Sequence, residues 1–282
     1  MYKIGLSSCS KIIGEELFEE YVKNNISDME ISEETYDDFD YKKAGKLAKA
    51  YGINLWSLHL PFVPFEEIDI SALEKEKREH TFEVFGEIIK NAADIGIDKF
   101  VVHPSGEPIG DEERSERLKY SRESLSKLAD ICHAAGGIIC VEDLPRTCLG
   151  HSTEEMKFLT AEDSRIKVCF DTNHITVENP EDVIVSLGEK IATIHVSDFD
   201  FINERHWLPG EGKINWKNVM AALEKIGYGG SFMYEISYRC PKTILRNRNL
   251  EAADFALNAK ELFEGKNLTV ISTPKPNLGM FE

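Results

Sequence analysis

Eight short apolar segments, separated by longer amphipathic stretches, recur along the 282 residues of this chain. Apolar runs of this length are typical of parallel strands that are buried on both faces. The segments are residues 3–8, 28–32, 54–60, 99–103, 137–142, 166–171, 191–196 and 230–236. Between them, apolar side chains recur at helical spacing, most regularly in residues 41–51, 71–95 and 112–135. The pattern therefore predicts strands and helices in alternation.

Eight strand–helix units in a chain of this length predict a single-domain α/β protein, a (β/α)8 barrel. A doubly wound open sheet is the competing fold, but it requires a glycine-rich phosphate turn after an early strand. The residues that follow the first segment contain no such turn. We expect the barrel to span residues 1–266. Residues 267–282, which include Pro274 and Pro276, are expected to form an extended C-terminal arm.

The chain carries 33 basic and 50 acidic side chains, a formal net charge of −17. This excess argues against nucleic-acid binding, because phosphate neutralisation by Lys and Arg supplies most of that affinity. No apolar run approaches the ~20 residues of a membrane helix, and the first residues do not have the pattern of a secretory signal. The six cysteines form no CxxC pair, which predicts reduced thiols. We therefore expect a cytoplasmic protein with no membrane partner.

Titratable side chains lie at the carboxyl ends of several predicted strands, on the face where barrel enzymes build their active sites. They are His59, His103, Glu142, Asp171, His174, His195 and Glu235. Several carboxylates buried together without a compensating charge are unfavourable. A divalent cation is the simplest compensation, because carboxylates and imidazoles are ligands for Mn, Mg, Co or Zn. The pattern therefore predicts a divalent-metal site on this face.

The segment after the seventh predicted strand is the most specific local feature of the sequence. Glu204, His206 and Trp207 lie close together there, and two glycines that follow permit a tight backbone path. A charged pair and a Trp in one turn predict a wall of the site. Asn215 comes at the end of the segment, and we expect it to cap the next helix.

Residues 236–250 form a basic stretch that contains no acidic side chain. Its basic residues are Arg239, Lys242, Arg246 and Arg248. Two interpretations remain open, a solvated loop that leads into a helix or a phosphate-binding site. Barrels often bind phosphate in the loops after strands seven and eight. If the stretch faces the site, Arg239 would bind an acidic or phosphorylated substrate.

Three segments make the chain resemble the xylose-isomerase-like TIM barrel superfamily, from the first strand to about residue 265. They are Asp171-Thr172-Asn173-His174, His195-Val196-Ser197-Asp198 and the turn over residues 206–216. The superfamily contains sugar isomerases and epimerases together with endonuclease-IV-type apurinic endonucleases. The resemblance implies that one divalent metal is bound by Glu142, Asp171, His195 and Glu235.

By this resemblance, the chain would be a metal-dependent isomerase or epimerase of carbohydrate metabolism that acts on a sugar or sugar phosphate. Glu142 and Glu235 would be the catalytic pair, one removing the proton alpha to the carbonyl and the other returning it through an enediolate. The expected substrate-binding residues are His59, His103, His174, Glu204, His206, Trp207 and Arg239. Many relatives associate, which favours a homo-oligomer.

Other functions use a similar set of residues. The endonuclease branch binds three zinc ions with additional ligands and would cleave abasic DNA. The matching residues here are His59, His103, His174, His206 and Glu204, which stands where that branch has aspartate. The sequence departs from that branch at Asn173, where its usual residue is cysteine. A dehydratase acting on a keto-inositol would begin with the same proton abstraction. A barrel without catalytic activity is a further alternative, against which the complete ligand set argues.

Overall fold

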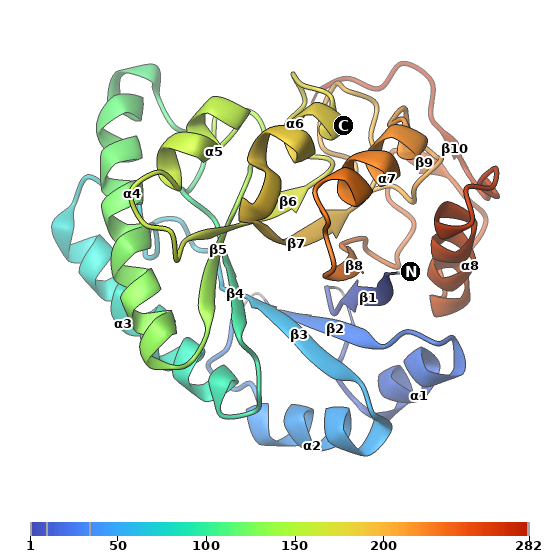
Figure 1. The fold of residues 1–282 in the computed structure, drawn as a ribbon, viewed down its shortest axis with the longest axis horizontal. Helices are drawn as coiled ribbons and strands as arrows, with labels where there is room; N and C mark the ends of the chain where they lie inside the picture. The colour runs from blue at the N-terminus through green and yellow to red at the C-terminus, as the bar shows by residue number, and fades with distance from the viewer. Residues whose placement is uncertain (1, 10, 34, 281–282) are drawn as a thin grey trace.

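A closed barrel of eight parallel strands forms the centre of the computed structural model, which describes residues 2–9, 11–33 and 35–280 (Figure 1). The strands follow one another in sequence order, and β1 pairs with β8 to close the barrel. They are β1 (Lys3–Ser7), β2 (Asp28–Ser32), β3 (Asn54–His59), β4 (Lys99–Val102), β5 (Ile138–Glu142), β6 (Lys167–Asp171), β7 (Ile191–Val196) and β8 (Ser231–Tyr234). The predicted single-domain (β/α)8 barrel is confirmed.

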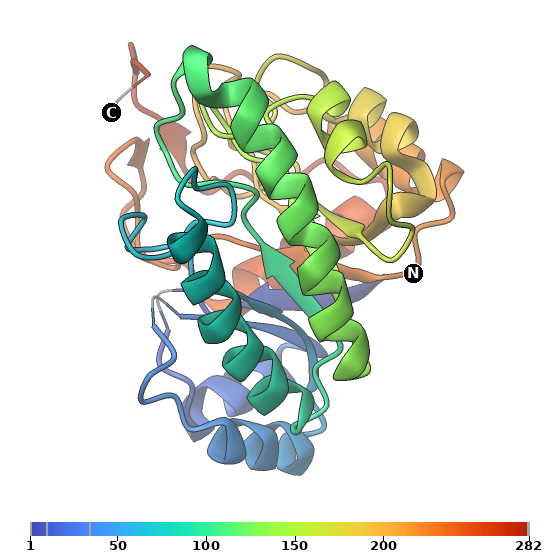
Figure 2. The same ribbon diagram turned by 90° about the vertical axis from the view of Figure 1, so that its left-hand side faces the viewer.

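Eight α-helices of the described residues surround the barrel (Figure 1). They are α1 (Glu15–Lys23), α2 (Tyr41–Tyr51), α3 (Lys75–Ala93), α4 (Asp111–Ala134), α5 (Thr153–Leu159), α6 (Pro180–Leu187), α7 (Trp216–Lys225) and α8 (Ala252–Phe263). A 3-10 turn, η1 (Gly188–Lys190), follows α6. The two longest helices, α3 and α4, lie side by side against the outside of the barrel (Figure 2).

The helices form where the sequence places an apolar stripe, and some of them begin at a capping side chain. In α3, Phe85, Ile89 and Ala92 are buried at helical spacing and pack toward the strands. Asn215 caps α7 as expected, because its side chain accepts a hydrogen bond from the backbone N–H of Asn218. Gly227 follows α7 with a φ of 69°, a left-handed conformation that suits glycine at the end of a helix.

The core has an outer layer between strands and helices and a small inner layer within the barrel. The outer layer holds most of the buried apolar side chains, including Phe100, Val102 and Phe232. The inner layer contains Val101, Cys140 and Cys169. All six cysteines are free, which confirms the expected reduced thiols.

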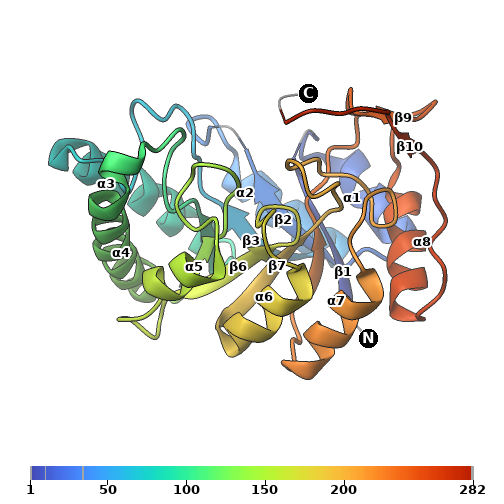
Figure 3. The ribbon, with the colours of Figure 1, turned by 90° about the horizontal axis from the view of Figure 1, so that it is seen from above.

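Two short strands, β9 (Ile244–Leu245) and β10 (Thr273–Pro274), pair antiparallel and were not expected from the sequence. They lie with the described C-terminal residues at the end of the barrel opposite the N-terminus (Figure 3). Of the predicted arm, residues 267–280 are described, and residues 281 and 282 lie outside the described residues. Within the described part of the chain, no helix is both long and apolar enough to cross a membrane.

The basic stretch of residues 236–250 includes two arginines that pair with acids elsewhere in the chain. Arg246 is buried with its guanidinium 3.0 Å from Glu211. Arg248 binds Asp254 in the first turn of α8. These two arginines are therefore engaged in holding the loop before α8.

Candidate active site

A pocket of about 390 Å³ opens at the carboxyl ends of the strands. Seven of the predicted site residues line it: His59, His103, Glu142, His174, Glu204, His206 and Glu235. These side chains come from β3, β5 and the segments that follow β4, β6, β7 and β8. The parallel strands end together on this face, which is why residues so far apart in sequence meet here.

Four residues at the base of this pocket bring their ligand atoms within 4.8 Å of one another: Glu142, Asp171, His195 and Glu235. Nδ1 of His195 lies 2.7 Å from Oε1 of Glu142 and 3.4 Å from Oε2 of Glu235. Oδ2 of Asp171 is fully buried and has no hydrogen-bond partner among the described residues. Three carboxylates around one imidazole, with one oxygen unpaired, fit a divalent cation.

Three further groups of possible metal ligands adjoin the first, and one of them adds Cys169 to Glu142 and His195. His59 and His103 place Nε2 3.0 and 3.2 Å from Oε2 of Glu142. On the other side, His174, Glu204 and His206 form a group whose ligand atoms also lie within 4.8 Å of one another. Glu142 therefore belongs to both the basal group and the first flanking group.

The histidines are oriented in the way that metal ligands usually are. Nδ1 of His59 bonds the carbonyl of Leu60 at 2.8 Å, and Nδ1 of His174 bonds the carbonyl of Asp143 at 2.7 Å. A carbonyl only accepts, so these nitrogens carry the proton and Nε2 of each ring is the remaining ligand atom. Nδ1 of His206 is held in the same way by the carbonyl of Glu235. Anchoring one ring nitrogen fixes the other as a ligand.

Burial and charge shift the pKa values of this cluster in opposite directions. Burial raises the pKa of the Asp171 carboxyl well above its usual value. Burial acts the same way on Glu142, but the adjacent His195, His103 and His59 outweigh it and hold its pKa well below the usual value. Burial lowers the pKa of His59, yet the hydrogen bond and charge of Glu142 raise it to about 9. The pocket thus pairs an ionised glutamate with several imidazoles.

Two predicted substrate contacts, Trp207 and Arg239, do not line the pocket, whereas Phe62 does. Phe62 is 38% exposed at the pocket and stacks on His103 with ring centroids 4.4 Å apart. Trp207 is buried away from the lining and donates from Nε1 to Thr243. Arg239 is exposed and is not a lining residue. The substrate contacts expected of Trp207 and Arg239 stay predictions.

Two residues of the site were missed from the sequence. Arg146 lines the pocket between Glu107 and Glu204. Glu30, in β2, is fully buried with Oε2 3.0 Å from Nε2 of His195. Neither residue follows a strand directly, which was the signal used to choose candidates.

Cys9 also lines the pocket. Burial raises the pKa of its thiol to about 12, so the thiol is protonated at neutral pH. A protonated thiol is a poor nucleophile and a poor metal ligand.

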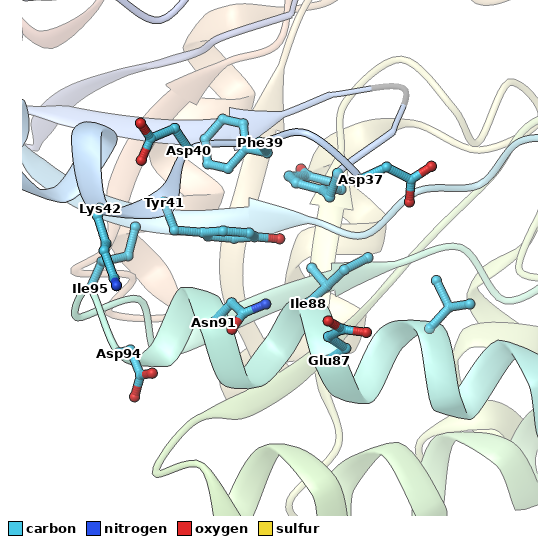
Figure 4. A pocket seen from close by; sticks show the side chains of 12 residues that line it. Asp37, Phe39, Asp40, Tyr41, Lys42, Glu87, Ile88, Asn91, Asp94 and Ile95 are labelled. Carbon is cyan, nitrogen blue, oxygen red and sulfur yellow. The ribbon is translucent and has the colours of Figure 1, made fainter.

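A second cavity, of about 560 Å³, lies outside the barrel between α2 and α3 (Figure 4). Tyr41 and Lys42 of α2 face Glu87 and Asn91 of α3 across it (Figure 4). Each metal-ligand group found among the described residues contains at least one residue that lines the other pocket and none that lines this cavity. The pocket at the strand ends is therefore the candidate active site.

Comparison with known proteins gives the family that the sequence motifs resemble. The family model described as xylose isomerase-like TIM barrel matches residues 17–258. A solved D-tagatose 3-epimerase-like protein superposes with a TM-score of 0.78 and 25% sequence identity, covering 94% of this chain and 98% of that one.

The curated relatives include proteins named for two different functions. D-psicose 3-epimerase of Ruminiclostridium cellulolyticum is 30% identical over 144 residues, which are 49% of this chain and 45% of that protein. A probable endonuclease 4 of Mycoplasmoides gallisepticum is 26% identical over 204 residues, which are 62% of this chain and 64% of that protein. The match therefore spans less than two thirds of the length of either relative.

Proposed function

The chain belongs to the xylose isomerase-like TIM barrel family, and we propose that it is a divalent-metal-dependent sugar epimerase whose substrate is an unphosphorylated ketose. One observation carries this proposal. The ligand atoms of Glu142, Asp171, His195 and Glu235 converge at the base of a pocket large enough for a monosaccharide. Similarity to the 3-epimerases supports the same reaction class.

Glu142 and Glu235 would carry the proton transfers. Each approaches Nδ1 of His195, but they come from β5 and from the residue directly after β8. One carboxylate would remove the proton alpha to the carbonyl, and the other would return it to the opposite face of the same carbon. A bound divalent cation would supply positive charge opposite the enediolate oxygens. His174 and His206 would bind sugar hydroxyls from the other wall of the pocket.

The charge of the lining favours a neutral sugar. Arg146 is the only Lys or Arg among the described residues that line the pocket. Its guanidinium is already bonded to both oxygens of Glu107 and lies 2.8 Å from Oε1 of Glu204. No lining cation is then left for a phosphate group.

Hydrogen exchange with solvent tests the reaction. The protein, loaded with Mn²⁺ or Co²⁺, is incubated in D₂O with a panel of ketoses and ketose phosphates. We expect deuterium at a single carbon alpha to the carbonyl, together with the epimer, for at least one free ketose. Exchange confined to phosphorylated sugars would reject the neutral substrate, and Arg239→Ala would then show whether Arg239 binds the phosphate. No exchange with any sugar would reject the epimerase.

Glutamine variants test the two catalytic carboxylates. Glu142→Gln and Glu235→Gln should each lower kcat by about 10²–10⁴-fold, because general acid–base catalysis contributes this much. The metal content of each variant, measured by elemental analysis, separates loss of the base from loss of a ligand. Glu178→Gln is a matched control, since Glu178 binds Thr153 outside the pocket. Near-normal exchange in either active-site variant would contradict the two-carboxylate scheme.

A second function is favoured by the two flanking groups of ligands. His59, His103, His174, Glu204 and His206 add possible sites for further metal ions beside the basal group. Three ions would suit phosphodiester hydrolysis, and a probable endonuclease 4 is among the relatives. Elemental analysis of protein purified without chelators decides between the two. One ion per chain supports the epimerase, whereas three zinc ions would make abasic DNA the first substrate to test.

A further inference from the structure

Glu30 is a buried acid that the proposed reaction does not use. It lies in the middle of β2, and its side chain reaches across the inside of the barrel to β7. Oε2 lies 3.0 Å from Nε2 of His195 and accepts a hydrogen bond of 2.7 Å from the hydroxyl of Ser57 on β3. Oε1 is buried and has no hydrogen-bond partner among the described residues. An acid in this position needs a reason, because burying a carboxylate is unfavourable.

We propose that Glu30 is the positioning residue of the metal site: it holds the proton of His195 on Nε2, so that Nδ1 is the atom presented to the metal. The proposal rests on the metal centre proposed above. Nδ1 of His195 faces the basal group, 2.7 Å from Glu142 and 3.4 Å from Glu235, whereas Nε2 faces Glu30. A cation bound by Glu142 and Glu235 would replace the proton between Nδ1 and Glu142, so the imidazole would keep its proton on Nε2 and donate it to Oε2 of Glu30.

Glu30 differs from the groups that orient the other three histidines. His59, His174 and His206 are each anchored by a backbone carbonyl. His195 alone among these four is anchored by a carboxylate, which adds negative charge to the imidazole as well as orientation. A carboxylate partner raises the basicity of a ligating histidine. His195 should therefore contribute more to metal affinity than a histidine anchored by a carbonyl.

The test compares metal binding by Glu30→Gln with that by a matched control. Glutamine preserves the volume and an oxygen that accepts from Nε2, but it removes the charge. Asp28 is the control because it lies two residues earlier on β2, is equally buried and also has one unpaired oxygen. Its other oxygen binds Asn54 rather than a histidine. Mn²⁺ dissociation constants are measured by calorimetry on metal-free protein, and thermal unfolding checks that each variant folds.

We expect Glu30→Gln to weaken Mn²⁺ binding by about 10–100-fold, the range found when such partners are replaced, while Asp28→Asn binds within about twofold of the parent. Equal affinity in Glu30→Gln and the parent would overturn the role of Glu30. Equal weakening in both variants would also overturn it, because a general effect of losing a buried acid would explain the result. Failure of the parent to bind Mn²⁺ would instead reject the proposed metal centre itself.

The tautomer gives a readout that a merely structural role would not change. In Zn²⁺-loaded protein, long-range ¹H–¹⁵N correlation of the imidazole should show His195 protonated at Nε2 in the parent and in Glu30→Gln. Glu30→Ala removes the acceptor, and we expect it to lose this fixed tautomer. A parent with the proton on Nδ1 would overturn the proposal. If Glu30→Ala does not fold, the parent spectrum and the Glu30→Gln affinity still decide it.

Discussion

Arg146 adopts a left-handed backbone conformation, with a φ of 54°, at the mouth of the candidate active site. This region costs a residue with a Cβ about 1 kcal/mol, so contacts of the residue must stabilise it. Its guanidinium binds Glu107 at 2.7 and 2.8 Å and lies 2.8 Å from Glu204. Its carbonyl is bonded by Nδ1 of His151. Arg146 therefore joins the loops after β4, β5 and β7, and it keeps two carboxylates from facing each other without a cation.

Replacing Arg146 by Met should raise the KM for the ketose by about tenfold or more, because loops displaced by 1 Å weaken a site strongly. A double-mutant cycle that combines this change with Glu107→Gln isolates the interaction between Arg146 and Glu107. We expect the two single changes and the double change to be non-additive in kcat/KM by about 0.5–3 kcal/mol, as for residues in one ionic network. Strict additivity would show that Arg146 and Glu107 act on the substrate independently.

The loop between β7 and α7 is built around one buried acid, Asp198. Its carboxylate accepts hydrogen bonds from the backbone N–H groups of Phe199, Gly210 and Ile214 at 2.8, 2.8 and 3.1 Å. It also accepts one from Nε1 of Trp216 at 2.9 Å. Asp198 pairs through its backbone with the residue after His206. This network returns the loop to the pocket and so positions the wall that the sequence predicted there.

Gly212→Ala should disrupt this loop, because a Cβ at Gly212 would overlap Oδ1 of Asp198 and the carbonyl of Phe199. The backbone would have to move, and we expect a loss of about 1–3 kcal/mol in the free energy of unfolding, with a larger proportional loss of kcat/KM. Urea denaturation and steady-state kinetics measure the two effects. Gly229→Ala is the control, since a Cβ there meets no atom within 4 Å. Unchanged kinetics in Gly212→Ala would show that the loop does not position the site.

The strands were predictable because each is a local apolar run, and each predicted bound lies within two residues of the observed one. The histidines and acids that follow them were predictable for the same reason. The role of Glu30 was not predictable from the sequence, because an acid inside a five-residue strand can face either side of the sheet. Only the closure of the barrel brings β2 opposite β7. The place of Arg146 in the site was not predictable either, since a left-handed backbone at a residue other than glycine has no local sequence signal. The β9–β10 pairing joins two-residue segments, which are too short for any periodicity.

At the scale of the whole molecule, the fold concentrates acidic side chains at one end of the barrel. Glu30, Glu142, Asp143 and Asp171 are all fully buried there, and Glu235 adjoins them. The chain as a whole carries −17, so distant charges do not compensate this cluster. Protonated histidines compensate part of it, and a divalent cation would compensate much of the rest. Metal binding should therefore stabilise the entire barrel as well as the active site.

Removing divalent metal with EDTA should lower the Tm of the protein, because an ion that binds only the folded state stabilises it by mass action. At a free Mn²⁺ concentration of 100 times Kd, the gain is about 2.7 kcal/mol, or roughly 5–10 °C for a domain of this size. Scanning calorimetry with a series of Mn²⁺ concentrations measures the shift. Glu142→Gln should abolish most of it, since that change removes a ligand from the basal group. A Tm that does not depend on Mn²⁺ would mean that the histidines alone balance the buried acids, and the metal-dependent epimerase would then lose its physical basis.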